Sequence, residues 1–140
     1  KKYFVFGLHE SYTSKSVLHE IKKIEDRVRI NTYDEINIRK QKDFRQEMEK
    51  AYAFIKNDCY GVEIDLDSIP NIPSSAMTLS GFSVEELRQF IHFFSQNENA
   101  AYLHICEGAP DLGDEKNSHL VGKLIGYLVT DFIKAKNELE

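Results

Sequence analysis

The sequence predicts a three-layer α/β domain in which a parallel sheet of about four strands is covered by helices. Short apolar runs bounded by polar segments recur along the chain, and each is followed by a segment with apolar residues at helical spacing. This strand–helix alternation repeats four times. Because parallel neighbouring strands need a crossover connection, usually a helix, such an order is typical of a parallel sheet.

The first half of the chain contains two of these strand–helix units. The run YFVFGL at residues 3–8 predicts a buried strand, and a helix follows over about 14–26. Alternating residues 27–33 predict the second strand, and residues 43–57 predict an amphipathic helix capped by Asp43. The residues at helical spacing in the two helices are Val17, Leu18, Ile21 and Ile24, and Phe44, Met48, Ala51, Tyr52 and Ile55.

The second half repeats the pattern. The run GVEIDLD at residues 61–67 predicts the third strand, and a loop rich in proline and serine follows it. Ser83 and Glu86 have the spacing of a capping box, which opens the helix VEELRQFIHFFSQ. Residues 100–109 predict the fourth strand, and apolar spacing predicts a last helix over about 119–136.

The composition excludes several classes of protein. A chain of 140 residues is long enough to bury a core, and a net charge of −5 without a basic cluster argues against a nucleic-acid partner. No apolar stretch is long enough to span a membrane, and there is no signal-peptide pattern. The two cysteines, in or beside apolar segments, suit reduced, buried thiols better than a disulfide framework, so we expect a cytoplasmic protein.

Acidic side chains follow the predicted strands at the rim where such sheets bind ligands. Asp65 and Asp67 end the third strand, Glu107 ends the fourth, and a loop beginning at His9 follows the first. Residues i and i+2 of a strand lie on one face, roughly 6.5–7 Å apart, so we expect Asp65 and Asp67 to project together. A divalent cation would cancel their repulsion. Alternatively, one aspartate caps the following turn and the other pairs with a lysine or arginine, and the short motif leaves both interpretations open.

An apolar strand ending in Asp-x-Asp resembles three families. Haloacid-dehalogenase-like phosphotransferases use the first Asp as a nucleophile, but they carry Thr or Val where this chain has Ile69 and place the motif on their first strand. Glycosyltransferases use the motif to hold a metal and a nucleotide diphosphate, usually in a looser loop. The third family is the ureohydrolases, which include arginase, agmatinase and formimidoylglutamase.

The resemblance to ureohydrolases extends beyond the motif. The segments EIDLD, SIPNIPSSAMTLSG, FSVEELRQFI and AYLHICEGAP follow one another in the order of that family. The resemblance covers residues 61–136, and more loosely residues 1–60, where FVFGLHES is similar to a strand and loop that shape the substrate pocket. It is closest to formimidoylglutamase, an enzyme of histidine degradation. It implies that residues 1–140 are the carboxyl-terminal part of an arginase-like domain.

The resemblance also implies a chemistry. Ureohydrolases use two Mn²⁺ ions to activate a bridging hydroxide that attacks the carbon of a small-molecule amidine or guanidine substrate. By this resemblance Asp65 would bridge both ions and Asp67 would bind one. Glu107 would accept hydrogen bonds from the cationic nitrogens of the substrate, and Thr78 would supply a hydroxyl that contacts it.

Two departures from the family pattern qualify this interpretation. Glu63 stands where the family prefers Ser or Thr, and we expect a nearby Lys or Arg to neutralise it. The family's other metal ligands, a His and an Asp-x-His-x-Asp cluster, have no counterpart in the sequence. Because these ligands are missing, we expect the chain to be inactive alone. Because it begins at Lys1 without a Met, we also expect it to be a piece of a longer protein. Its missing amino-terminal half would be its partner, in a homo-oligomer.

Other interpretations stay open. The parent could be an agmatinase or arginase, or the chain could be a non-catalytic binding or scaffolding module that keeps the fold. We expect His104 to be a hydrogen-bonded core or supporting group and Cys106 to be buried packing, because neither lies in a catalytic pattern.

Overall fold

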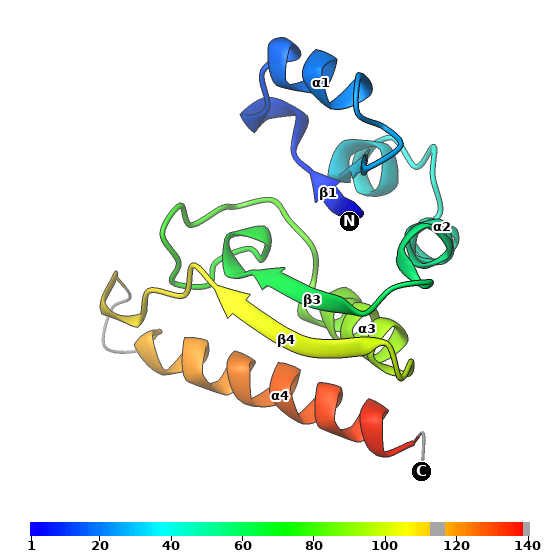
Figure 1. Ribbon diagram of the computed structural model, residues 1–140. Coiled ribbons are helices and arrows are strands. Elements are labelled where there is room, and N and C mark those ends of the chain that lie inside the picture. Colours follow the sequence, from blue (N-terminus) through cyan, green and yellow to red (C-terminus); the bar gives the residue numbers. More distant parts are fainter. Residues whose placement is uncertain (113–116, 139–140) are drawn as a thin grey trace. The chain divides into compact units, whose positions relative to one another are not determined.

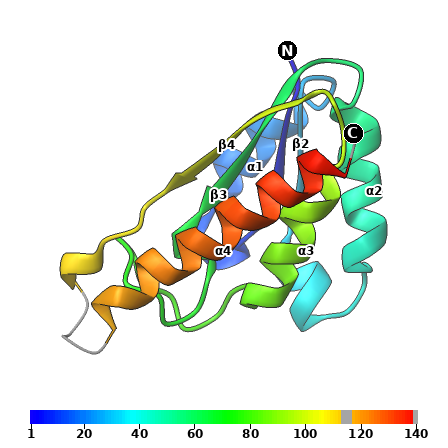
Figure 2. The same cartoon turned by 90° about the horizontal axis from the view of Figure 1, so that it is seen from below.

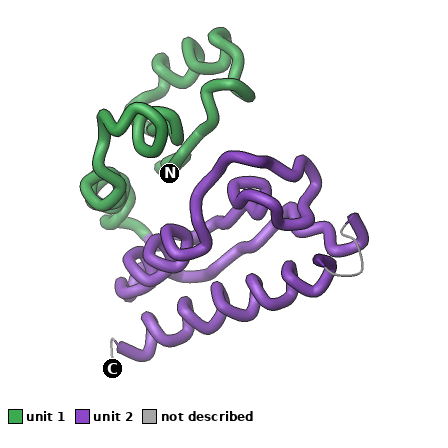
Figure 3. Tube along the Cα trace, turned by 180° about the vertical axis from the view of Figure 1, so that it is seen from behind, with its two compact units in different colours: residues 1–58 green, residues 59–140 purple. Residues whose placement is uncertain are grey.

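The structure is a computed structural model that describes residues 1–112 and 117–138. The chain divides into two compact units, residues 1–58 and 59–140 (Figure 3). Each unit carries one pair of parallel strands, so the predicted α/β class with parallel strands is confirmed, as two pairs of strands (Figure 1). Within the described part of the chain, no helix combines the length and apolar character needed to cross a membrane.

The first unit contains the predicted strand–helix order. Its elements are β1 (Tyr3–Leu8), α1 (Lys15–Lys22), β2 (Val28–Thr32) and α2 (Phe44–Ile55), with short helical turns at Glu10–Tyr12 and Asp34–Ile38. β1 pairs in parallel with β2, and the register shifts between Val5 and Leu8. Gly7 lies in that shift with a φ of 77°, a conformation that favours glycine, and its N–H donates to the Asn31 side chain at 2.7 Å.

The two helices of this unit differ in how they use their apolar residues. α1 ends at Lys22, four residues before the predicted end, and none of its residues is buried. α2 begins at the predicted cap, where Asp43 accepts the N–H of Gln46 at 2.9 Å. It buries Met48, Ala51 and Phe54, whereas Tyr52 and Ile55 from the predicted stripe are only half-buried. α2 therefore supplies most of the helical core of the unit.

The second unit packs two helices on one face of its strand pair. β3 (Tyr60–Asp65) and β4 (Ala100–Cys106) are parallel, and α3 (Val84–Ser95) connects them. α4 (Ser118–Asn137) follows β4 and lies beside α3 (Figure 2). Arg88 of α3 donates two hydrogen bonds to Asp131 of α4, at 2.6 and 3.1 Å.

Alternation along β3 separates the buried face from the exposed face. Val62 and Ile64 are buried beneath the helices, whereas Gly61, Glu63 and Asp65 are exposed. The core continues through Leu66 after the strand and includes side chains from both helices. Its largest fully buried aliphatic side chains are Leu66, Ile69, Ile91 and Leu128. The exposed face of β3 thus ends with Asp65, at the carboxyl end of the strand pair β3–β4.

Candidate metal and substrate site

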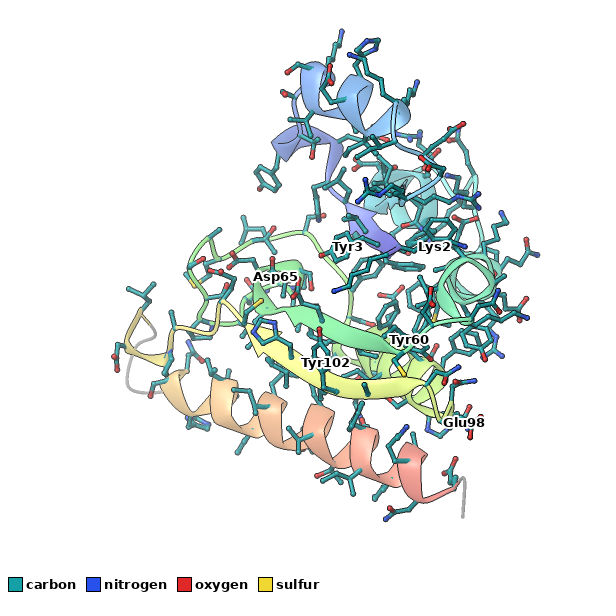
Figure 4. The ribbon with its side chains drawn as sticks, in the orientation of Figure 1. Lys2, Tyr3, Tyr60, Asp65, Glu98 and Tyr102 are labelled. Carbon is teal, nitrogen blue, oxygen red and sulfur yellow. The ribbon has the colours of Figure 1, made fainter. Side chains whose placement is uncertain are left out.

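β3 ends at Asp65, so the prediction of a strand through residue 67 is wrong (Figure 4). Leu66–Ser68 forms a turn of 3₁₀ helix, and Asp65 and Asp67 therefore do not alternate along one strand face. The Asp65 carboxylate instead accepts the N–H of Asp67 at 2.8 Å, and the Ser68 hydroxyl donates to the Asp65 carbonyl at 2.6 Å. Of the two interpretations, the turn-capping aspartate is thus observed.

Asp67 is held by the loop that follows the turn. Its carboxylate accepts the N–H of Ala76 at 2.8 Å and the hydroxyl of Ser75 at 2.9 Å. Among residues 1–112 and 117–138, no Lys or Arg forms an ion pair with Asp65 or Asp67. Within this described part of the chain, the Asp67 carboxylate is therefore compensated by neutral hydrogen-bond donors.

Glu107 reaches the same loop from the end of the neighbouring strand. β4 ends at Cys106, three residues before the predicted end, because Glu107 turns the backbone with a left-handed φ of 65°. The Ser75 N–H donates to the Glu107 carbonyl at 3.0 Å, and the Ser75 hydroxyl lies 2.5 Å from the Glu107 carboxylate. Asp67 and Glu107, which sequence reasoning placed at one rim, therefore meet at Ser75.

The acids act on one another electrostatically. Partial burial raises the pKa of the Asp65 carboxyl, and the negative charges of Asp67, Glu107 and Glu63 add to this, although the hydrogen bond from the Asp67 N–H opposes it. Burial also acts to raise the pKa of Asp67, but the hydrogen bonds it accepts from the loop outweigh burial and leave that pKa lowered. The pKa values of the two neighbouring carboxyls thus shift in opposite directions, raised for Asp65 and lowered for Asp67.

The Ser74 hydroxyl also acts on Asp67, but without forming a hydrogen bond to it. Ser74 is almost fully buried, and its hydroxyl oxygen has no partner within hydrogen-bonding geometry. It nevertheless helps to lower the pKa of Asp67, so the two groups interact at longer range. Both serines lie in the segment SIPNIPSSAMTLSG that resembles ureohydrolases, but the sequence predicts no role for either, because nothing local shows which acids a loop hydroxyl will meet.

Thr78, the other predicted substrate contact, bonds within its own loop. Its hydroxyl donates to the Ser80 carbonyl at 2.8 Å and accepts the Ser80 N–H at 3.2 Å. No bond joins Thr78 to the acids among the residues that the structure describes. Its contact with a substrate therefore stays a prediction.

His104 and Cys106 lie on β4 beside the acids of β3. His104 pairs across the strands with Glu63, Nδ1 to Oε2, at 3.1 Å, and both side chains are about half exposed. The predicted hydrogen bonding of His104 is confirmed, but a position in the core is wrong. Partial burial and the neighbouring acids raise the pKa of the Cys106 thiol, so the group stays protonated and is a poor nucleophile.

The loop that begins at His9 lies at the carboxyl end of β1 in the first unit. The His9 ring stacks on Tyr33 with centroids 4.7 Å apart. Glu10 accepts two hydrogen bonds from Arg39, at 2.6 and 2.9 Å, and this contact, with a bond from the Thr32 hydroxyl, lowers the pKa of Glu10 to about 2. These interactions give the loop a defined structure.

The fit to a metal ion is partial. Carboxylate oxygens are ligands that hard and borderline divalent cations accept, and Asp65 and Asp67 offer them at the end of one strand. Within residues 1–112 and 117–138, however, no group of three or more His, Cys, Asp or Glu side chains is arranged to hold a metal. The described residues can begin a metal site but do not complete one.

The fold is that of one part of the arginase-family ureohydrolases. No family model matches the sequence, and the comparison with curated proteins finds no match. Solved structures do match: a formimidoylglutamase from Bacillus subtilis superposes with a TM-score of 0.80 over 94% of this chain, at 19% identity.

Two further structures give the same result. An arginase from Bacillus subtilis has a TM-score of 0.76 over 93% of this chain at 19% identity, and a Trypanosoma cruzi formiminoglutamase with Mn²⁺ has 0.74 over 94% at 15%. The chain spans only 40%, 44% and 43% of the lengths of these three structures, in the order given. The predicted partial arginase-like fold is confirmed, and at these identities the likeness is one of fold.

Proposed function

We propose that this chain is part of a manganese-dependent hydrolase of linear amidine or guanidine C–N bonds, with formimidoylglutamase as its specific activity. One observation carries the proposal: Asp67 and Glu107 converge on Ser75 at the carboxyl ends of β3 and β4, with Asp65 capping the turn between. The fold shared with formimidoylglutamase and arginase structures supports the assignment.

In this proposal Asp65 and Asp67 hold manganese. When bound, the metal pair would supply an activated water for attack on the substrate carbon. Burial first, and then the charges of Asp67, Glu107 and Glu63, raise the pKa of Asp65, and a cation nearby would offset both effects. The Trypanosoma cruzi structure is of a formiminoglutamase with Mn²⁺.

Glu107 binds the substrate in this proposal. A carboxylate accepts two parallel N–H bonds from a planar amidinium or guanidinium group, and the second oxygen of Glu107 accepts no hydrogen bond from the described residues. Thr78 remains a second candidate contact, through movement of its loop.

The remaining ligands would come from a missing amino-terminal half of the same protein, because the described residues contain no complete metal group. We also propose that the chain is inactive alone, that the complete protein is a homo-oligomer, and that it works in the cytoplasm, where its two free thiols would stay reduced. The prediction that both thiols are buried is wrong, because Cys59 is exposed and Cys106 is only half-buried.

The test uses the full-length polypeptide that contains this chain. We expect Asp65→Ala and Asp67→Ala to lose both bound manganese and amidine hydrolysis, and Glu107→Gln to keep the metal and raise KM. Asp111→Asn is the matched control, because it removes an exposed acid just beyond β4 that has no role in the proposal. Normal manganese content and activity in Asp65→Ala would refute the metal assignment.

A substrate panel separates the three ureohydrolase activities. Formimidoylglutamate presents a formimino (amidine) group, whereas agmatine and arginine present a guanidinium group on different tails, so the ratio of their kcat/KM values identifies the activity. We expect formimidoylglutamate to give the highest value, and a higher value for agmatine or arginine would redirect the assignment within the same chemistry.

A non-catalytic binding or scaffolding module is the second candidate. The absence of a three-ligand metal group among residues 1–112 and 117–138 favours it. In that case the full-length polypeptide would neither bind manganese stoichiometrically nor hydrolyse any member of the panel. The sequence upstream decides cheaply between the two, since the enzyme needs an Asp-x-His-x-Asp cluster there.

A further inference from the structure

Ser75 lies between two carboxylates that come from different parts of the second unit. Its hydroxyl oxygen is 2.9 Å from Oδ2 of Asp67 and 2.5 Å from Oε2 of Glu107. Asp67 precedes it by 8 residues and Glu107 follows it by 32, so the contact joins the turn after β3 to the end of β4. Ser75 is thus the point at which the two acids meet.

The two carboxylate contacts of Ser75 need one more hydrogen than its hydroxyl supplies. A serine hydroxyl has one hydrogen, and two ionised carboxylates are acceptors only. One of the two short oxygen–oxygen contacts therefore receives the hydrogen of Ser75, and the other needs a donor or cation from elsewhere. The contacts around Ser75 are therefore one positively polarised hydrogen or cation short.

Backbone hydrogen bonds hold Ser75 in place independently of its side chain. The Ser75 N–H donates to the Glu107 carbonyl at 3.0 Å, the Ala109 N–H donates to Pro73 at 3.0 Å, and Ser74 bridges to Gly108. On the other side, the Ala76 N–H holds Asp67 at 2.8 Å. Backbone hydrogen bonds therefore join the loop to the segments that carry Asp67 and Glu107. The Ser75 hydroxyl then sets the position of the Glu107 carboxylate.

We infer that Ser75 is a positioning residue, which holds the Glu107 carboxylate in one arrangement beside Asp67 so that Glu107 accepts the N–H groups of a planar cation. This inference rests on the proposed function for the identity of the cation, an amidinium or guanidinium group. Such a group supplies the missing N–H donor and a positive charge together. The positioning itself depends only on this chain.

The positioning is tested on the 140-residue chain without metal or substrate. Three-bond couplings in isotopically labelled protein report whether the Glu107 side chain occupies one rotamer or averages over several. We expect one dominant rotamer in the unmodified chain, averaging in Ser75→Ala, and restoration in Ser75→Thr, which keeps the hydroxyl. Ser80→Ala, the same change in the same loop, should leave Glu107 unaffected.

Two outcomes of this measurement would overturn the inference. Glu107 could average in the unmodified chain, or it could keep its rotamer in Ser75→Ala. Amide spectra verify that each variant is folded, and Ser75→Cys gives a second test, since a thiol is similar in size but a weak donor. None of these outcomes bears on whether the protein is a hydrolase.

The ligand part is tested in the full-length polypeptide. Ser75→Ala should raise KM for the amidine or guanidine substrate about tenfold, equivalent to about 1.4 kcal/mol, with manganese content unchanged, and Ser75→Thr should restore it. Loss of manganese, or an unchanged KM, would overturn the ligand part. Because Asp65→Ala tests the metal chemistry separately, failure of the inference is distinguishable from failure of the proposed function.

Discussion

Gly81 allows the loop after β3 to close against the turn that carries Asp67. A Cβ placed on Gly81 would lie 2.1 Å from the Ser68 carbonyl oxygen and 2.8 Å from its carbon. The neighbouring Phe82 N–H donates to the same oxygen at 2.9 Å. We therefore predict that Gly81→Ala destabilises the second unit, because backbone atoms, unlike a flexible side chain, cannot move aside cheaply.

The magnitude follows from two contributions. Overpacking typically costs about 1–3 kcal/mol, and weakening the bond from Phe82 to Ser68 removes about 0.5–1.5 kcal/mol. The free energy of unfolding should therefore fall by roughly 2–4 kcal/mol. With a urea dependence of about 2 kcal/mol per molar, the unfolding midpoint of this unit should move down by roughly 1–2 M.

The assay is a urea titration followed by amide spectra, so that each unit is observed through its own residues. Leu124 and Leu128 report the second unit, and Met48 reports the first, whose midpoint should not change. The control is Gly122→Ala on α4, where a Cβ meets no atom within 4 Å. It should stabilise the second unit by about 1 kcal/mol, since alanine favours a helix interior. Equal midpoints for Gly81→Ala and the unmodified chain would refute the reasoning.

Three other predictions concern single side chains. Asp65→Asn should raise the urea midpoint of the metal-free chain at pH 7. A raised pKa of Asp65 means that the folded state loses stability as pH rises through that pKa, so the increase in midpoint should shrink as pH falls toward 4. A lower midpoint for Asp65→Asn at pH 7 would contradict this. Carboxyl resonances should show Glu10 titrating at about 2, and Arg39→Ala should return its pKa toward 4.5; an unchanged midpoint would show that Arg39 is not the cause. Ser83→Ala should cost about 0.5–2 kcal/mol in urea unfolding of the second unit, because it removes the cap that bonds the Glu86 N–H at 3.1 Å, and a cost within error of zero would argue against the cap.

The sequence by itself determined the order and type of the regular elements. Four strands and four longer helices lie where apolar periodicity places them, and the caps at Asp43 and at Ser83 with Glu86 are observed as predicted. These features are local: an i to i+3 cap or an alternating strand brings together residues that are already neighbours along the chain. Their boundaries were less well determined, and α1, β3 and β4 all end earlier than their patterns indicate.

Tertiary structure alone decided how the acids are compensated. The Asp-x-Asp motif predicted two side chains projecting from one strand, but Asp65 caps a turn and Asp67 is held by the loop that follows that turn. The role of Ser75 depends on the pairing of β3 with β4, which brings Glu107 across 32 residues of sequence. The pattern of side chains along the sequence encodes which residues are buried and where each helix begins. The contact of Asp67 and Glu107 with the Ser75 hydroxyl depends instead on strand register and loop closure, which are fixed only when the chain packs.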